Sequence, residues 1–168
     1  MNTQNNTRKS IYNITFAAMV AALYVVLTFV ANSIGLASGV IQVRLSEALT
    51  ILPFFSGAAI PGLVIGCVTA NWLTGCVFLD IVFGSLATLI GALGSYLLRK
   101  YKFLVPLPPI LANTIIVPYV LRFAYDVPDS IPFMMATVGA GEIISCYILG
   151  LALLFALQPF ANKLFKKS

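Results

Sequence analysis

Histidine is absent from this 168-residue sequence, and charged residues make up only 9% of it. Without histidine, a mixed Cys/His zinc site cannot be completed. The few cysteines are scattered in apolar surroundings, which is typical of small core residues: Cys67, Cys76 and Cys146. The sequence also has no phosphate-binding glycine loop, no paired metal-ligand motif and no nucleophile with a nearby base. It therefore predicts a protein that is not an enzyme and that uses neither a cofactor nor a metal.

Hydrophobic residues, in contrast, make up 60% of the chain, and its mean hydropathy is +1.00. Several apolar runs approach about 20 residues, the length that crosses roughly 30 Å of hydrocarbon. We predict an all-α, multi-pass protein of the cell membrane, with a single domain over residues 1–168 that is a compact bundle of six transmembrane helices. The predicted spans are 10–32, 45–58, 60–74, 80–100, 104–124 and 132–160. Because Pro53 and Pro61 interrupt the short second and third spans, we expect these to be tilted or partly unwound around a cavity.

The basic residues predict the topology. Arg8 and Lys9 precede the first span, and three lysines follow the last one, so both termini are expected in the cytoplasm. Residues 99–102 add three more basic side chains in a predicted inner loop. Four of the five acidic residues map to outer loops or outer helix ends: Glu47, Asp80, Asp126 and Asp129. The net charge of +5 is therefore a signal of orientation in the bilayer, and no nucleic-acid partner is expected.

One carboxylate, Glu142, falls inside the last apolar stretch. About ten residues into a helix, it lies roughly 15 Å deep, where an ionised side chain costs about 2.5 to 3.5 kcal/mol. Small neighbours, Gly139, Gly141 and Ser145, leave space beside it. Glu142 is therefore predicted to line a solute pocket and to accept hydrogen bonds from an ammonium group or an amidine-like edge. The alternative is a structural carboxyl that is protonated or hydrogen-bonded within the protein.

Other polar residues gather towards the predicted outer side. The segment 32–47 contains enough glycine and polar residues to fold back as a lid over an opening. Within it, Arg44 and Glu47 either pair with each other at helical spacing or contact a ligand. Trp72 is either an anchor at the membrane interface or a platform for stacking.

Three further residues complete the predicted substrate-binding set. Asn71 lies at the end of the third span, near the outer ends of the helices. Asp80 either caps the fourth helix or contacts the ligand. Asn113, in the middle of the fifth span, either forms an interhelical hydrogen bond or contacts the ligand.

Small residues predict where helices approach closely. Gly62 and Gly66, and the series from Ala87 to Ser95, recur every four residues and indicate packing between neighbouring helices. The first span carries a flat strip of two overlapping pairs: Ala17, Ala18, Ala21 and Ala22. From spacing alone, this strip either packs within the bundle or docks an external helix.

These residues resemble a known family. The alanine strip in a first helix with basic flanks resembles the docking motif of S components, the six-helix substrate-binding subunits of energy-coupling-factor transporters. Further segments resemble the QueT family of queuosine-precursor S components and extend the resemblance over most of the chain. They are Val43-Arg44-Leu45-Ser46-Glu47-Ala48-Leu49, Pro61-Gly62-Leu63, Gly66-Cys67, Asp80-Ile81-Val82-Phe83-Gly84-Ser85-Leu86-Ala87-Thr88-Leu89, Leu111-Ala112-Asn113 and Gly139-Ala140-Gly141-Glu142.

The resemblance implies an importer subunit in the lipid bilayer. It would capture a 7-deazaguanine such as preQ1, preQ0 or queuine from outside, and then associate with a membrane coupling subunit and two cytoplasmic ATPases. We assign Glu142 to the base edge, Asp80 or Glu47 to an ammonium group, Asn71 and Asn113 to the carbonyl and ring nitrogens, Trp72 to stacking and Arg44 to the lid. The alanine strip is assigned to docking on the coupling subunit.

Rival functions stay open at this point. The protein could be an S component for another small solute such as a vitamin, or a stand-alone secondary transporter, although no internal repeat is visible. A small membrane enzyme is the remaining alternative. A binding screen, uptake without the coupling subunits, and turnover of a bound ligand would separate the three.

Overall fold

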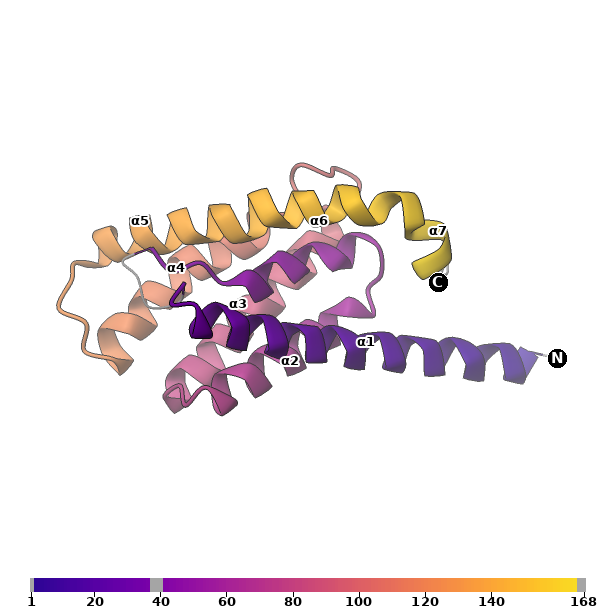
Figure 1. Ribbon diagram of the computed structural model, residues 1–168, viewed down its shortest axis with the longest axis horizontal. Coiled ribbons are helices and arrows are strands. Elements are labelled where there is room, and N and C mark those ends of the chain that lie inside the picture. Colours follow the sequence, from indigo (N-terminus) through magenta and orange to yellow (C-terminus); the bar gives the residue numbers. More distant parts are fainter. Residues whose placement is uncertain (1, 37–40, 166–168) are drawn as a thin grey trace.

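The computed structural model describes residues 2–36 and 41–165, and every regular element in these ranges is helical (Figure 1). The predicted all-α class is therefore confirmed. Residues 37–40, in the predicted lid, and the terminal Lys166 and Lys167 lie outside the described ranges. The elements are α1 (Asn2–Ser33), η1 (Leu45–Phe54), α2 (Ala59–Leu73), α3 (Phe78–Leu97), α4 (Leu107–Ala124), α5 (Ile131–Glu142), η2 (Ile143–Leu149), α6 (Gly150–Leu157), η3 (Gln158–Phe160) and α7 (Ala161–Leu164).

Four helical stretches in the described ranges are long and apolar enough to cross a membrane. They are Asn6–Ser33, Phe78–Leu97, Leu107–Ala124 and Ile131–Phe160. Two shorter apolar helices, η1 and α2, fall on the predicted second and third spans. The chain is thus a multi-pass membrane protein whose helices follow the predicted spans.

The short element η1 is a 3₁₀ helix of 10 residues with Pro53 inside it. Runs of this length are uncommon because 3₁₀ hydrogen bonds have poor geometry. Residues 46–53 are all buried, so packing against the surrounding helices holds the element in place. In α2, Pro61 lies in the first helical turn, where its missing N–H costs little, and the third span is a regular α-helix.

Glycines let α1 and α2 approach closely. A Cβ at Gly62 would overlap the backbone oxygen of Ala17, and one at Gly66 would lie 2.7 Å from Tyr24 Cβ. A second close approach joins α3 to α4, because a Cβ at Gly91 would lie 2.6 Å from Pro109 Cα. Both series of small residues, Gly62 with Gly66 and Ala87 to Ser95, therefore have the packing role that their spacing predicted.

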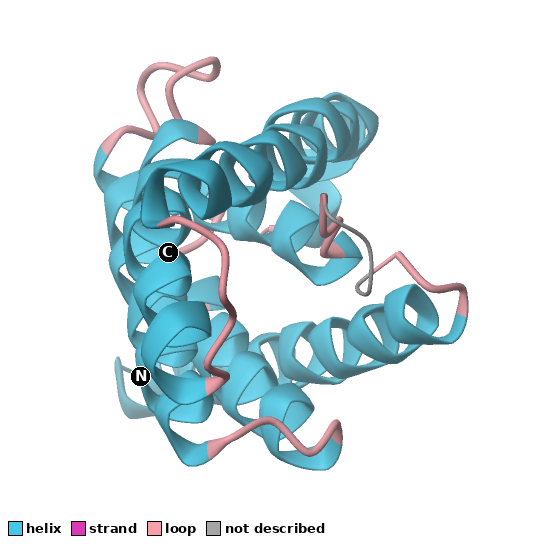
Figure 2. Cartoon of the chain, turned by 90° about the vertical axis from the view of Figure 1, so that its left-hand side faces the viewer, coloured by secondary structure: helices cyan, strands magenta, loops and turns pink. Residues whose placement is uncertain are grey.

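Both termini lie at the same end of the molecule (Figure 1). There the Tyr12 hydroxyl donates to the Leu164 carbonyl, and the rings of Phe55 and Phe165 stack with centroids 4.5 Å apart. At the opposite end, seen in Figure 2, the backbone N–H of Val77 donates to the Tyr125 hydroxyl and joins the start of α3 to the end of α4. The site described next lies at this opposite end.

A candidate ligand-binding site at one end of the bundle

A cavity of about 360 Å³ lies where α1 and α4 end and α3 begins. Known small-ligand sites usually enclose about 300 to 1,000 Å³. Three of the residues predicted to bind substrate, Arg44, Asn71 and Asp80, line this cavity. The complete lining is Thr28, Ala31, Asn32, Gln42, Arg44, Ser46, Asn71, Thr74, Cys76, Asp80, Val117, Leu121, Tyr125 and Val127.

Asp80 lies in the first turn of α3 but does not cap the helix, since the N-cap position is Val77 and no side chain caps it. Its Oδ2 accepts a hydrogen bond of 2.8 Å from the Tyr125 hydroxyl. Its Oδ1 faces Gly84, where a Cβ would lie 3.3 Å from Oδ1 and 3.2 Å from Asn71 Nδ2. Gly84 thus keeps space beside the Asp80 carboxylate and the Asn71 amide.

Tyr125 is a cavity residue that no sequence motif singled out, because it follows α4 among other apolar and aromatic residues. Partial burial, together with the hydrogen bond to Asp80, raises the pKa of the Tyr125 phenol above its ordinary value. The phenol therefore stays protonated at neutral pH, and its hydroxyl donates a hydrogen bond to the Asp80 carboxylate.

The chain between α1 and η1 packs against the last long helix. The backbone N–H of Arg44 donates to Ser145 Oγ at 3.1 Å. A Cβ at Gly141 would overlap the carbonyl oxygen of Gln42. These contacts hold Arg44 at the cavity wall.

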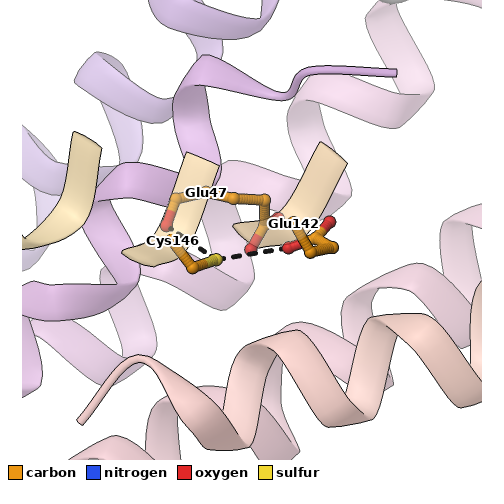
Figure 3. Close-up of side chains that lie close together, drawn as sticks. All are labelled: Glu47, Glu142 and Cys146. Carbon is orange, nitrogen blue, oxygen red and sulfur yellow. Dashed lines mark hydrogen bonds between the residues drawn. The ribbon is translucent and has the colours of Figure 1, made fainter. Parts of the chain in front are cut away.

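Deeper in the bundle, two carboxylates meet. One oxygen each of Glu47 and Glu142, together with the Cys146 sulfur, all lie within 4.8 Å of one another (Figure 3). We call this group the carboxylate cluster (Glu47, Glu142 and Cys146). Cys146 donates to Glu142 Oε2 at 3.2 Å and approaches the backbone oxygen of Glu47 at 3.6 Å.

The burial of Glu47 was not predicted. Glu47 lies at a helix end, in the first turn of η1, and its side chain is 0% exposed and faces the interior. Tyr24 donates to Glu47 Oε1, and Oε2 has no hydrogen-bond partner. No hydrogen bond joins the Glu47 carboxylate to Arg44 in the described structure, so the alternative of a simple Arg44–Glu47 pair is not favoured.

Glu142 is 4% exposed, so its predicted burial is confirmed, and it is not the isolated acid that the sequence suggested. Asn113 on α4 lies close to both carboxylates. It is 1% exposed, and neither its amide oxygen nor its amide nitrogen has a hydrogen-bond partner. Asn113 thus lies within reach of both carboxylates, and its two alternatives, an interhelical hydrogen bond to them or a contact with the ligand, both stay open.

The carboxylate cluster adjoins the cavity. On α1, Thr28 Oγ1 donates to the Tyr24 carbonyl at 2.9 Å and is hydrogen-bonded to Ser46 Oγ at 3.0 Å, which connects the cavity wall with the partner of Glu47. Three elements each place one residue in the cavity wall and another, a few residues away, at or beside the cluster. The wall residues are Thr28 on α1, Ser46 on η1 and Val117 on α4. Their counterparts at the cluster are Tyr24, Glu47 and Asn113. One helical turn is about 5.4 Å, so the cluster and Asn113 lie just beyond the floor of the cavity.

Trp72 lies outside this site. Its side chain is 71% exposed on α2, and it does not line the cavity. This placement favours the alternative of an anchor at the membrane interface.

In the alanine strip, one pair of residues packs within the bundle and the other pair is exposed. Ala17 and Ala21 are half-buried, and their backbones lie against Gly62 and Gly66 of α2. Ala18 and Ala22 are exposed. Only the second pair is therefore free to meet another protein.

Comparison with known proteins agrees with the motifs. The family model described as the QueT transporter matches residues 14–159. A relative, the queuosine precursor transporter QueT of Lactococcus lactis subsp. cremoris (strain MG1363), is 38% identical over 92 residues, which are 54% of this chain and 54% of the relative. The chain thus spans about half the length of the curated relative that it matches. No solved structure matches the chain significantly. The family model covers most of the sequence, and the chain belongs to the QueT transporter family.

Proposed function

We propose that this protein is the substrate-binding S component of an energy-coupling-factor importer and that it captures a queuosine precursor, a 7-deazaguanine such as preQ1, preQ0 or queuine. It binds the base from outside the cell. It then associates with a membrane coupling subunit and two cytoplasmic ATPases, which provide the energy for release inside. Family membership and the relative's name support the substrate class.

The cavity is the observation that carries this proposal. A guanine-like edge has adjacent ring and exocyclic N–H donors, which match the two oxygens of one carboxylate. Its carbonyl oxygen needs a donor, and its flat ring needs an aromatic or apolar wall. The cavity supplies Asp80, Arg44, Asn71 and Tyr125 on adjoining walls, and its volume of about 360 Å³ suits a small heterocycle.

This arrangement changes one assignment. The base edge was assigned to Glu142, but Glu142 is not among the lining residues of this cavity, whereas Asp80 is. We therefore assign the base edge to Asp80, with Arg44 or Asn71 at the carbonyl. Tyr125 orients Asp80 through its hydrogen bond of 2.8 Å. In this assignment Trp72 has no contact with the ligand.

Docking on the coupling subunit is assigned to α1. Its exposed alanines, Ala18 and Ala22, leave a smooth helical face on which another helix can approach closely. Their partners in the strip, Ala17 and Ala21, are occupied by α2. The assignment rests on the family resemblance and on this exposure.

The direct test is ligand binding to the purified protein in detergent. We expect preQ1, preQ0 or queuine to raise the melting temperature, and vitamins of similar size to leave it unchanged. Asp80→Asn should weaken binding by about 10-fold or more, because it removes a charged acceptor. Asp129→Asn, at an exposed acid that does not line the cavity, is the matched control.

Two results would contradict the proposal. Stabilisation by a vitamin alone would mean an S component for another solute. Uptake that persists in cells lacking the coupling subunit and the ATPases would mean a stand-alone transporter.

A further inference from the structure

A second hollow, a groove of about 440 Å³, lies between α1 and α6, towards the end of the molecule that holds both termini. The face of α1 from Tyr12 to Leu23 forms one wall, α6 forms the other, and Leu49 and Leu52 of η1 lie between them (Figure 1). The groove shares no lining residue with the cavity described above. It is therefore a separate site, to which the proposed function gives no role.

The groove is closed at the end near the termini. There the chain turns back from α6 through η3 and α7 towards α1, and the Tyr12 hydroxyl donates to the Leu164 carbonyl. The Phe165 ring packs edge-on against Phe16, with ring centroids 5.5 Å apart. Further along α1, the lining side chain of Met19 is 51% exposed. The α1 wall is thus open in the part of the helix that crosses the hydrocarbon of the membrane.

The length of the groove matches one leaflet of a bilayer. From Tyr12 to Leu23 the helix rises about 16 Å, at about 1.5 Å per residue. Half of a hydrocarbon core of about 30 Å is about 15 Å. Apart from Thr15, and from Lys163 at the closed end, the described lining is apolar or aromatic. A groove of this length and lining fits one acyl chain that runs along the helix.

Basic side chains gather at the closed end. Lys163 lines the groove there and is exposed. Arg8 and Lys9 are exposed as well, and they precede Tyr12 by about one helical turn on the same side of α1. None of the five acidic residues of the chain is among the described residues that line the groove. A lipid whose tail fills the groove places its phosphate at this level, where three cations attract it.

We propose that this groove binds one anionic phospholipid from the leaflet on the side of the termini. One acyl chain lies between α1 and α6 against Leu49 and Leu52, and the headgroup phosphate accepts a hydrogen bond from Lys163. A zwitterionic lipid has the same tails but adds a positive charge beside the lysine, so it binds less tightly. The bound lipid fills the space between α1 and α6 and stabilises the bundle.

A protein helix is the competing occupant, because the groove borders the exposed alanine face of α1. Met19 directly follows Ala18, and Leu23 directly follows Ala22. The charge at the closed end favours the lipid, since a helix would have to bring its own acid to Lys163. A phospholipid has its phosphate next to its tails, at the level of the membrane interface.

The test titrates the full-length protein in detergent with dioleoylphosphatidylglycerol or dioleoylphosphatidylcholine, and native mass spectrometry measures the lipid bound. We expect phosphatidylglycerol to bind about 5-fold more tightly or better. Met19→Trp fills the groove from its exposed wall and should weaken the binding of both lipids by about 10-fold or more. Ile14→Trp is the matched control, because Ile14 is 67% exposed on the same helix and does not line the groove.

The headgroup contact is tested by a second variant. Lys163→Gln should lower the preference for phosphatidylglycerol by about 5-fold, the effect of one cation near an anionic lipid. Lys100→Gln should preserve the preference, because Lys100 is exposed but does not line the groove.

Equal lipid binding by the wild type and Met19→Trp would overturn the inference, and so would a preference that survives Lys163→Gln. If Met19→Trp binds both lipids normally but no longer associates with the coupling subunit, the groove receives a protein helix and the lipid is rejected. Normal lipid binding with loss of a dimer would assign the groove to a second copy of the chain. If Met19→Trp does not fold, Lys163→Gln decides alone. None of these results bears on the binding of a 7-deazaguanine in the cavity, so the proposed function is tested separately.

Discussion

A single methyl group at Gly141 tests how the cavity wall is held. A Cβ there would overlap the carbonyl oxygen of Gln42, which is backbone and cannot rotate away. Gly141→Ala should therefore push the chain before Arg44 off α5 and destabilise the protein by about 1 to 3 kcal/mol. The expected result is a lower melting temperature in detergent, with weaker ligand binding because Arg44 moves with this chain.

Gly150→Ala is the control for this substitution. The nearest heavy atom to a Cβ at Gly150 is the Ala48 oxygen at 3.6 Å, an ordinary contact. Because alanine favours a helix by about 1 kcal/mol over glycine, this variant should be as stable as the wild type or more so. Equal stability of the two variants would mean that the chain before Arg44 does not rest on Gly141.

Residue positions along the bundle were only partly predictable. The burial of Glu142 follows from one acid in a long apolar stretch. The burial of Glu47 does not, because it lies in the first turn of a 3₁₀ helix that has no clear periodic pattern. Trp72 was ambiguous for a different reason, since lipid-facing and core-facing surfaces are both apolar and composition does not distinguish them.

At the scale of elements, helix α1 has two faces with different roles: one packs against α2, and the other is exposed and is proposed to dock on the coupling subunit. Ala18→Leu with Ala22→Leu places bulk on its exposed face only. We expect this double variant to bind ligand and to melt like the wild type, but to lose uptake in cells that contain the coupling subunit and the ATPases, because the smooth face for docking is gone. Binding and uptake are measured on the same preparation of cells.

The matched variant is Ala17→Leu with Ala21→Leu. These alanines lie against Gly62 and Gly66, so larger side chains should separate α1 from α2 and lower the melting temperature. If this pair abolishes uptake without loss of stability, and the exposed pair has no effect on uptake, the docking face has been assigned to the wrong side of α1.

The elements themselves were largely predictable. Long apolar runs bounded by prolines and charges located α1, α3, α4 and the continuous last helix. Helical irregularity was less predictable. The π-helical turn η2 directly follows Glu142 in a sequence, Ile143–Leu149, with no proline or glycine to indicate it.

At the scale of the whole molecule, charge is divided between the two ends. Six basic side chains lie away from the cavity: Arg8, Lys9 and Lys163 are near the termini, and Arg99, Lys100 and Lys102 follow α3, which begins at the cavity. The end with the cavity carries Arg44, Arg122 and the acids Asp80, Asp126 and Asp129. By the positive-inside rule, we expect the cavity end to face outward, as the proposed capture of an external solute requires.

Cysteine labelling tests this orientation. In a background with the three native cysteines replaced by alanine, Asp129→Cys lies beside the cavity end, and Lys100→Cys lies at the other end, and both positions are exposed. A membrane-impermeant maleimide added to intact cells should label position 129 and should reach position 100 only after the cells are permeabilised. Because basic side chains near the ends of the spans determine the orientation, the pattern should hold in any bacterial host that inserts the protein. The reverse pattern would place the cavity in the cytoplasm, where it could not capture a solute from outside.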